Sequence, residues 1–102
     1  MKTWIQALKI DEVPIMGSRV LYYKEEEIAI FKTKNGEIHA INNICPHKKG
    51  KLSEGLVHES MVTCPLHNWD INLKNGEVKS EDCNCSTIYE TQLKDDLIYI
   101  KI

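Results

Sequence analysis

The chain has 102 residues, a length typical of one domain with a single modest hydrophobic core. Hydrophobic residues make up 42% and charged residues 27%, and no stretch is of low complexity, which excludes a largely disordered chain. Thirteen Lys and Arg against fifteen Asp and Glu give a net charge of -2, which argues against a dedicated nucleic-acid-binding protein. We therefore expect residues 1–102 to form one domain that binds no nucleic acid.

The distribution of apolar residues bears on location. The longest apolar runs are four residues, far short of a membrane-spanning helix. Gln6 and Lys9 interrupt the start of the chain, which therefore lacks the apolar region of a signal peptide. We expect a soluble cytoplasmic protein with no membrane partner. Four cysteines in such a protein indicate metal or redox chemistry rather than structural disulfides.

Apolar and polar residues alternate mostly with a period of two, which is typical of strands. The predicted strands are, in chain order, residues 20–23, 27–32, 38–42, 59–63 and 97–102. A short turn is expected over residues 11–16, with Asp11 as its cap. No amphipathic helix is found, and the pattern predicts a small all-β domain.

Three turns support this assignment. The pairs Asn35-Gly36 and Asn75-Gly76 each lie between two apolar stretches, and Asn-Gly supplies the positive φ values of a tight hairpin turn. Residues 94–96 (Lys-Asp-Asp) are predicted to form a third turn before the last strand. Alternation stops over residues 43–56 and again around residues 64–68, so two structured loops are expected near the middle of the chain.

These two loops hold the residues that carry chemistry. The first contains Cys45-Pro46-His47 and the second, after sixteen intervening residues, contains Cys64-Pro65-Leu66-His67. Each short pair can place two donor atoms on one tight turn, and the interval can bring both turns together across a hairpin. Two thiolates and two imidazoles suit either a tetrahedral zinc ion or a two-iron cluster with mixed ligands.

The pattern resembles a Rieske [2Fe–2S] site. Residues 42–55 and 62–69 resemble the small subunit of NAD(P)H-dependent nitrite reductase, and the similarity extends to Trp4, residues 27–31, both Asn-Gly turns and residues 97–100. The resemblance implies a Rieske-type small β-sandwich or barrel with a two-loop cluster-binding subdomain within residues 43–72.

By the same resemblance, one [2Fe–2S] cluster is bound, with Cys45 and Cys64 on one iron and His47 and His67 on the other. Neutral imidazole donates less negative charge than thiolate, so the iron bound by histidine is the easier one to reduce. This iron is therefore expected to carry the transferred electron.

The chain contains no dinucleotide-binding motif, no P-loop and no separate catalytic nucleophile or base, so any catalysis is expected to belong to a partner. The resemblance implies electron transfer with a large flavin- and siroheme-containing subunit that reduces nitrite to ammonia in nitrate assimilation. Two alternatives stay open. One is the Rieske ferredoxin component of a ring-hydroxylating oxygenase system, and the other is a zinc-binding structural module.

Other cysteines and histidines receive ordinary interpretations. Cys83 and Cys85 are predicted to be free thiols, because they lie outside both loops. His39 and His58 are predicted to be surface or packing residues.

A cluster of lysines offers a candidate docking charge. Lys48, Lys49 and Lys51 give residues 43–56 a local charge of +2, against Glu54 alone. Such a patch would steer an acidic partner toward the two loops.

Overall fold

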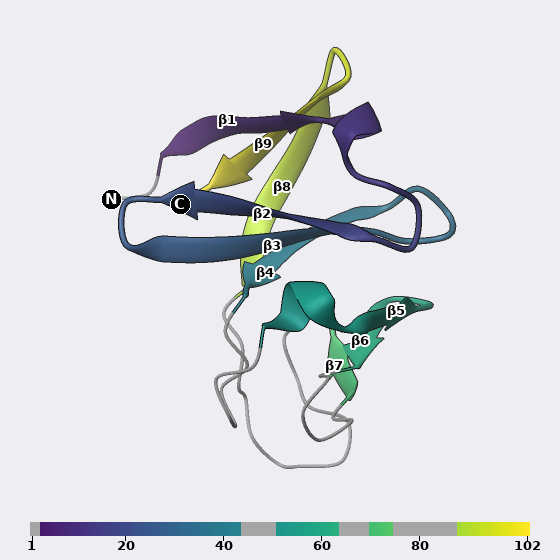
Figure 1. Ribbon diagram of the computed structural model, residues 1–102. Helices are drawn as coiled ribbons and strands as arrows, with labels where there is room; N and C mark the ends of the chain where they lie inside the picture. The colour runs from purple at the N-terminus through teal and green to yellow at the C-terminus, as the bar shows by residue number, and fades with distance from the viewer. Residues whose placement is uncertain (1–2, 44–50, 64–69, 75–87) are drawn as a thin grey trace.

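The protein is described by a computed structural model that covers residues 3–43, 51–63, 70–74 and 88–102 (Figure 1). Within these residues the chain forms nine strands and two short 3-10 helices, and every strand pairing is antiparallel. The elements are β1 (Trp4–Lys9), η1 (Ile10–Glu12), β2 (Ser18–Tyr23), β3 (Glu26–Lys32), β4 (Ile38–Asn42), η2 (Leu52–Glu54), β5 (Leu56–His58), β6 (Met61–Thr63), β7 (Asp70–Asn72), β8 (Ile88–Lys94) and β9 (Leu97–Lys101). The predicted all-β class is confirmed. In the described part of the chain, no helix has the length and apolar character needed to cross a membrane.

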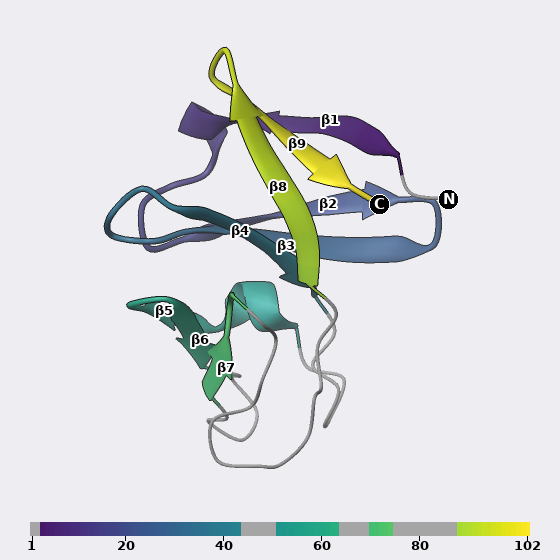
Figure 2. The ribbon, with the colours of Figure 1, turned by 180° about the vertical axis from the view of Figure 1, so that it is seen from behind.

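Six strands form one sheet in the order β1-β9-β8-β4-β3-β2. Figures 1 and 2 show that this sheet curls, so that β1 and β9 lie across from β2 and β3 in a barrel-like arrangement. Thr3 and Ile102 exchange two backbone hydrogen bonds, of 2.7 and 2.9 Å, beyond the end of the β1–β9 pairing. The β1–β9 pair thus joins the two ends of the described sequence.

The other three strands form a small sheet in the order β5-β6-β7. It belongs to the stretch between β4 and β8, and it lies with η2 beneath the barrel-like sheet (Figure 1). The helix η2 contacts β2 and β3. This stretch contains the range 43–72 in which the cluster-binding subdomain is predicted.

The strand β3 joins two hydrophobic cores. Its residues Ile28, Ala29, Ile30 and Phe31 are all fully buried, although alternate side chains of a strand point to opposite faces. Ile28 and Ile30 pack in the core inside the barrel-like sheet, whereas Ala29 and Phe31 pack in the core shared with η2 and the small sheet. The uninterrupted apolar run therefore reflects a strand that is covered on both faces.

The turns confirm two predicted hairpins and refine one of them. Between β3 and β4, the amide of Gly36 donates to the Thr33 carbonyl at 2.9 Å, and Gly36 has a φ of 85°. Asn35 does not have a positive φ, so the expectation that both residues of the pair adopt one is wrong. Between β8 and β9, Asp95 and Asp96 have φ values of 52° and 65°, the pattern of a two-residue type I′ turn.

The predicted strand boundaries are close for β2, β3, β4 and β9. The predicted strand 59–63 is shorter in the structure, because Glu59, with a φ of 54°, and Ser60 form the turn between β5 and β6. The strands β1, β5 and β8 were not predicted, and β7 was anticipated only as the apolar residues before Asn75-Gly76. That pair lies outside the described residues.

The predicted turn after β1 exists as η1, but its capping residue differs. The carboxylate of Glu12, rather than that of Asp11, accepts a hydrogen bond from the backbone amide of Lys9 at 3.0 Å. The cap thus comes from the third helical position, where a Glu side chain can reach back to the first free amide.

Candidate metal centre

The predicted ligands lie outside the described residues, but the residues that flank them are described. These ligands are Cys45, His47, Cys64 and His67. We call residues 44–50 the first ligand segment and residues 64–69 the second ligand segment. Asn43 and Lys51 flank the first segment, and Thr63 and Asp70 flank the second.

Asn43 closes the base of the first ligand segment. This residue is 1% exposed, and its backbone amide donates to the Glu27 carbonyl at 2.8 Å, one residue beyond the β3–β4 pairing. Its own carbonyl accepts from the amide of Leu52 at 2.7 Å, and its Oδ1 accepts from the amide of Ser53 at 2.7 Å. Because Asn43 binds residues on the far side of the segment, the two ends of the segment lie together.

The carboxylate of Glu27 also binds both ends of this segment. Asn43 Nδ2 donates to its Oε2 at 2.5 Å, and Lys51 Nζ lies 2.8 Å from both oxygens. These bonds, that from Lys51 foremost and that from Asn43 next, hold the pKa of the Glu27 carboxyl below its ordinary value. The hydrogen bond to Glu27 likewise raises the pKa of the Lys51 ammonium. Lys51 is therefore an ion-pair residue whose charge is compensated by Glu27, and its role as a docking charge stays a prediction. Lys48 and Lys49 lie outside the described residues.

A second polar group closes the base of the second ligand segment. Thr63 and Asp70 are paired across β6 and β7, and Thr63 Oγ1 donates to Asp70 Oδ1 at 2.6 Å. His58, on β5, places Nε2 2.7 Å from Thr63 Oγ1 and 3.3 Å from Asp70 Oδ1. His58 was predicted to be an ordinary surface or packing residue, but it links all three strands of the small sheet.

The flanks of the two ligand segments meet at Gly55, which follows η2. A Cβ atom at Gly55 would lie 2.2 Å from the carbonyl oxygen of Thr63 and 3.1 Å from that of Leu52. This position has a φ of -82°, so glycine is required here by the close approach of the backbone rather than by an unusual conformation. The chain after the first ligand segment thus packs directly against the residue that precedes the second.

This arrangement fits a group that binds to both segments. Two thiolates and two imidazoles are the donors of mixed iron–sulfur ligation, and the structure holds the flanks of both pairs in contact through Gly55. Among the described residues, no group of three or more His, Cys, Asp or Glu side chains could hold a metal ion. The two ligand segments stay the predicted site of the metal centre.

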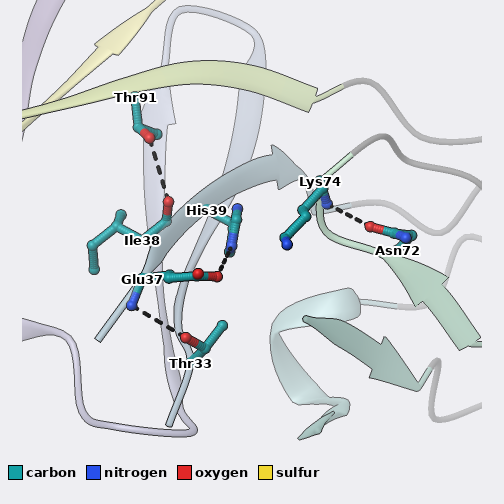
Figure 3. A network of polar contacts seen from close by, with 7 residues as sticks. All are labelled: Thr33, Glu37, Ile38, His39, Asn72, Lys74 and Thr91. Carbon is teal, nitrogen blue, oxygen red and sulfur yellow. Dashed lines mark hydrogen bonds and ion pairs between the residues drawn. The ribbon is translucent and has the colours of Figure 1, made fainter. Parts of the chain in front are cut away.

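The other predicted residues have separate surroundings. His39 lies on β4 and pairs with Glu37, with 3.2 Å between Nε2 and Oε1 (Figure 3). Nearby, Thr91 Oγ1 donates to the Ile38 carbonyl at 3.3 Å, which joins β8 to β4. These contacts lie within and beside the barrel-like sheet, consistent with the prediction that His39 is a surface or packing residue. Cys83 and Cys85 lie outside the described residues.

Comparison with known proteins gives the class of this chain. A family model described as "Rieske [2Fe-2S] domain" matches residues 3–91. The naphthalene 1,2-dioxygenase/salicylate 5-hydroxylase ferredoxin component of Ralstonia sp is 30% identical over 79 residues, which cover 74% of this chain and 72% of that protein. The chain belongs to the Rieske [2Fe–2S] domain family. It is a Rieske electron-transfer protein that carries a Rieske-type [2Fe–2S] cluster.

Solved structures agree with this class and extend over the whole chain. The structure of Escherichia coli NirD, a nitrite reductase small subunit, has a TM-score of 0.88 and 26% identity, covering 100% of this chain and 98% of NirD. A chain from Mycobacterium tuberculosis assigned as an NADH-dependent nitrite reductase small subunit has a TM-score of 0.91 at 18% identity, with 100% and 96% covered. The ferredoxin of Sphingomonas yanoikuyae B1 has a TM-score of 0.86 at 19% identity, with 98% and 99% covered. The last two identities support the fold alone.

Proposed function

We propose that this chain is the small, electron-transferring subunit of an NAD(P)H-dependent nitrite reductase. The observation that carries the proposal is the likeness to NirD, which spans the whole of this chain at 26% identity and a TM-score of 0.88. The partner would be the large flavin- and siroheme-containing subunit, in which nitrite is reduced to ammonia. Residues 1–102 would form one domain, and this chain would supply no catalytic residue.

At the proposed site, Cys45 and Cys64 would hold one iron, and His47 and His67 the other. When bound, the cluster accepts and donates one electron at a time. The remaining residues hold the ligands in place. Asn43 fixes the ends of the first ligand segment, and Thr63 fixes those of the second through its bond to Asp70.

The hydrophobic core beside the small sheet supports the same site. Leu52, Val62 and Ile71 are fully buried in one cluster, and each is next to a residue that closes a ligand segment or adjoins one. Packing at this density resists small displacements, so it fixes the segment ends relative to one another. A rigid frame of this kind keeps ligand positions similar in the oxidised and reduced protein.

A second candidate function is the ferredoxin component of a ring-hydroxylating oxygenase system. It is favoured by the 30% identity to the Ralstonia ferredoxin component and by the fold shared with the ferredoxin in a carbazole 1,9a-dioxygenase complex, at a TM-score of 0.84. The chemistry of this chain would be the same in both cases, and only the partner would differ.

The site is tested by chemical analysis of the purified protein. We expect two irons and two acid-labile sulfides per chain, with loss of both in Cys45→Ala and His67→Ala. Cys83→Ala is the matched cysteine control and should retain them. A colourless protein that contains zinc, or a normal cluster in both ligand variants, would refute the assignment of these ligands.

The partner is tested by affinity purification of the tagged chain from its native host, followed by mass spectrometry and assay of the co-purified fraction. A flavin- and siroheme-containing subunit with NAD(P)H-dependent nitrite reduction is the expected result. A ring-hydroxylating oxygenase in its place would reject the nitrite reductase proposal in favour of the second candidate.

A further inference from the structure

One carboxylate ties both ends of the first ligand segment to the barrel-like sheet. Glu27 accepts hydrogen bonds from Asn43, which precedes the segment, and from Lys51, which follows it. The backbone of Glu27 adds a fourth contact, because its carbonyl accepts from the Asn43 amide at 2.8 Å. The residues that bind Glu27 are 16 and 24 positions away in the sequence.

The strand that carries Glu27 makes it a firm anchor. The four residues after Glu27 are fully buried and pack in both hydrophobic cores. Glu27 itself is paired with Tyr22 of β2, and its side chain is only 17% exposed. Because Glu27 is fixed on β3, its hydrogen bonds hold both ends of the first ligand segment at a set position relative to this buried strand.

A further hydrogen bond attaches this part of the chain to β2, the edge strand next to β3. Ser18 Oγ, on β2, donates to the carbonyl of Ser53 at 2.8 Å. The amide of Ser53 is already bound by Asn43 Oδ1 at 2.7 Å. Residues 51–53 are thus held by Glu27, Asn43 and Ser18 together.

From this geometry we infer that Glu27 is a positioning residue for the cluster, acting by holding both ends of the segment that carries Cys45 and His47. The inference rests on the proposed function, since it requires these two residues to be ligands. Groups that orient ligands without touching the metal change its affinity by about 10- to 100-fold when they are removed.

Positioning and simple electrostatics make different predictions for this pair. Glu27→Gln removes a negative charge, whereas Lys51→Met removes a positive charge and keeps an unbranched side chain of comparable length. Charge alone would shift the reduction potential upward in the first variant and downward in the second. Loss of positioning would shift the potential in the same direction in both variants, because each substitution weakens the attachment of Lys51 to Glu27. Met offers no donor, and Gln offers one neutral oxygen in place of the two that Lys51 Nζ binds.

The experiment compares wild-type holoprotein with Glu27→Gln, Lys51→Met and the double variant. Glu25→Gln is the matched control, since Glu25 is exposed in the β2–β3 turn and the charge change is the same. We expect cluster release to an iron chelator to be about 10-fold faster in both single variants and no faster in the double variant. Their reduced-state electron paramagnetic resonance signals should be broadened, whereas Glu25→Gln should match the wild type.

Two results would overturn the inference alone. One is a cluster-loaded wild type whose Glu27→Gln and Lys51→Met variants release the cluster like Glu25→Gln. The other is opposite shifts in potential with unchanged signal widths and release rates, which would show an effect of charge only. If Glu27→Gln fails to fold, Lys51→Met still decides the question, because its side chain is 42% exposed. A wild-type chain without iron and sulfide would instead overturn the proposed function, and this inference with it.

Discussion

Replacing Gly55 with alanine would place a methyl group between the flanks of the two ligand segments. The added Cβ would lie 2.2 Å from the Thr63 carbonyl oxygen, whereas Cβ atoms essentially never approach such atoms within 3.0 Å. The backbones must therefore separate by about 0.8 Å at the point where η2 meets β6. Val62 Cγ2, at 3.1 Å, limits movement on another side.

The cost follows from this overlap. An extra carbon in a closely packed site lowers the free energy of unfolding by about 1–3 kcal/mol. Alanine also has fewer conformations than glycine in the unfolded chain, which raises the free energy of unfolding by about 0.4–1 kcal/mol. We expect a net loss of about 1–2 kcal/mol, which lowers the melting temperature of a chain this long by about 4–16 °C. Circular dichroism of the holoprotein at a fixed heating rate measures this change, and visible absorbance reports the cluster in the same sample.

Gly36 provides the control, because it is glycine for a different reason. Its φ is 85° and no atom lies within 4 Å of an added Cβ, so its substitution meets backbone strain and not overlap. Asparagine tolerates such a conformation, so Gly36→Asn should be milder than Gly36→Ala, whereas Gly55→Asn should be at least as harmful as Gly55→Ala. A wild-type melting temperature in Gly55→Ala would refute the packing argument.

Three further predictions concern stability, each measured by thermal unfolding. Replacing Asp95-Asp96 with Asn-Gly should raise the melting temperature by about 4–8 °C. Asn-Gly adopts the two positive φ values of this turn with less strain, and the reduced strain stabilises the fold by about 1 kcal/mol. An unchanged melting temperature would contradict the turn assignment. Phe31→Ala should lower the free energy of unfolding by about 3–5 kcal/mol, since Phe31 is fully buried. Tyr22→Ala, at a residue that is 72% exposed, should lower it by about 0.5 kcal/mol. Equal losses in the two variants would contradict the burial of β3. The pKa of Glu27 is lowered in the folded protein, so the contribution of Glu27 to stability is complete above its unfolded pKa of about 4.3 and is lost as the pH falls through the folded value. The higher melting temperature of the wild type relative to Glu27→Gln should therefore vanish in acid. A difference that persists in acid would contradict the ion pair.

The sequence predicted strands best where the pattern of apolar residues along the chain matches the residues that are buried in the structure. The strands β3, β4 and β9 were predicted because their apolar residues alternate or run together and are buried in the structure. The strand β8 was missed because its residues Ile88–Lys94 are mostly polar and largely exposed. The strands β5 and β7 have three residues each, too few for a period to be recognised.

The site illustrates the same division. The ligand candidates could be recognised from the spacing of Cys and His, since that spacing is local to each loop. The roles of Glu27 and Asn43 could not, because they depend on hydrogen bonds between residues that are distant in sequence. Gly55 was equally hidden, since its φ is ordinary and its need for glycine arises only when Thr63 is placed against it.

The pairing of β1 with β9 has a consequence for how the chain reaches this structure. Trp4 is registered with Lys101, so this edge of the sheet joins the most distant parts of the described sequence, whereas β2, β3 and β4 form a meander from neighbouring hairpins. Contacts between residues far apart in sequence form slowly, because the entropy of closing a long loop must be lost first. During synthesis, β1 would therefore wait with its hydrogen-bonding groups unpaired until the ribosome has released β9. The meander can meanwhile present Glu27 to the emerging first ligand segment, so the anchor for the cluster would exist before the sheet closes.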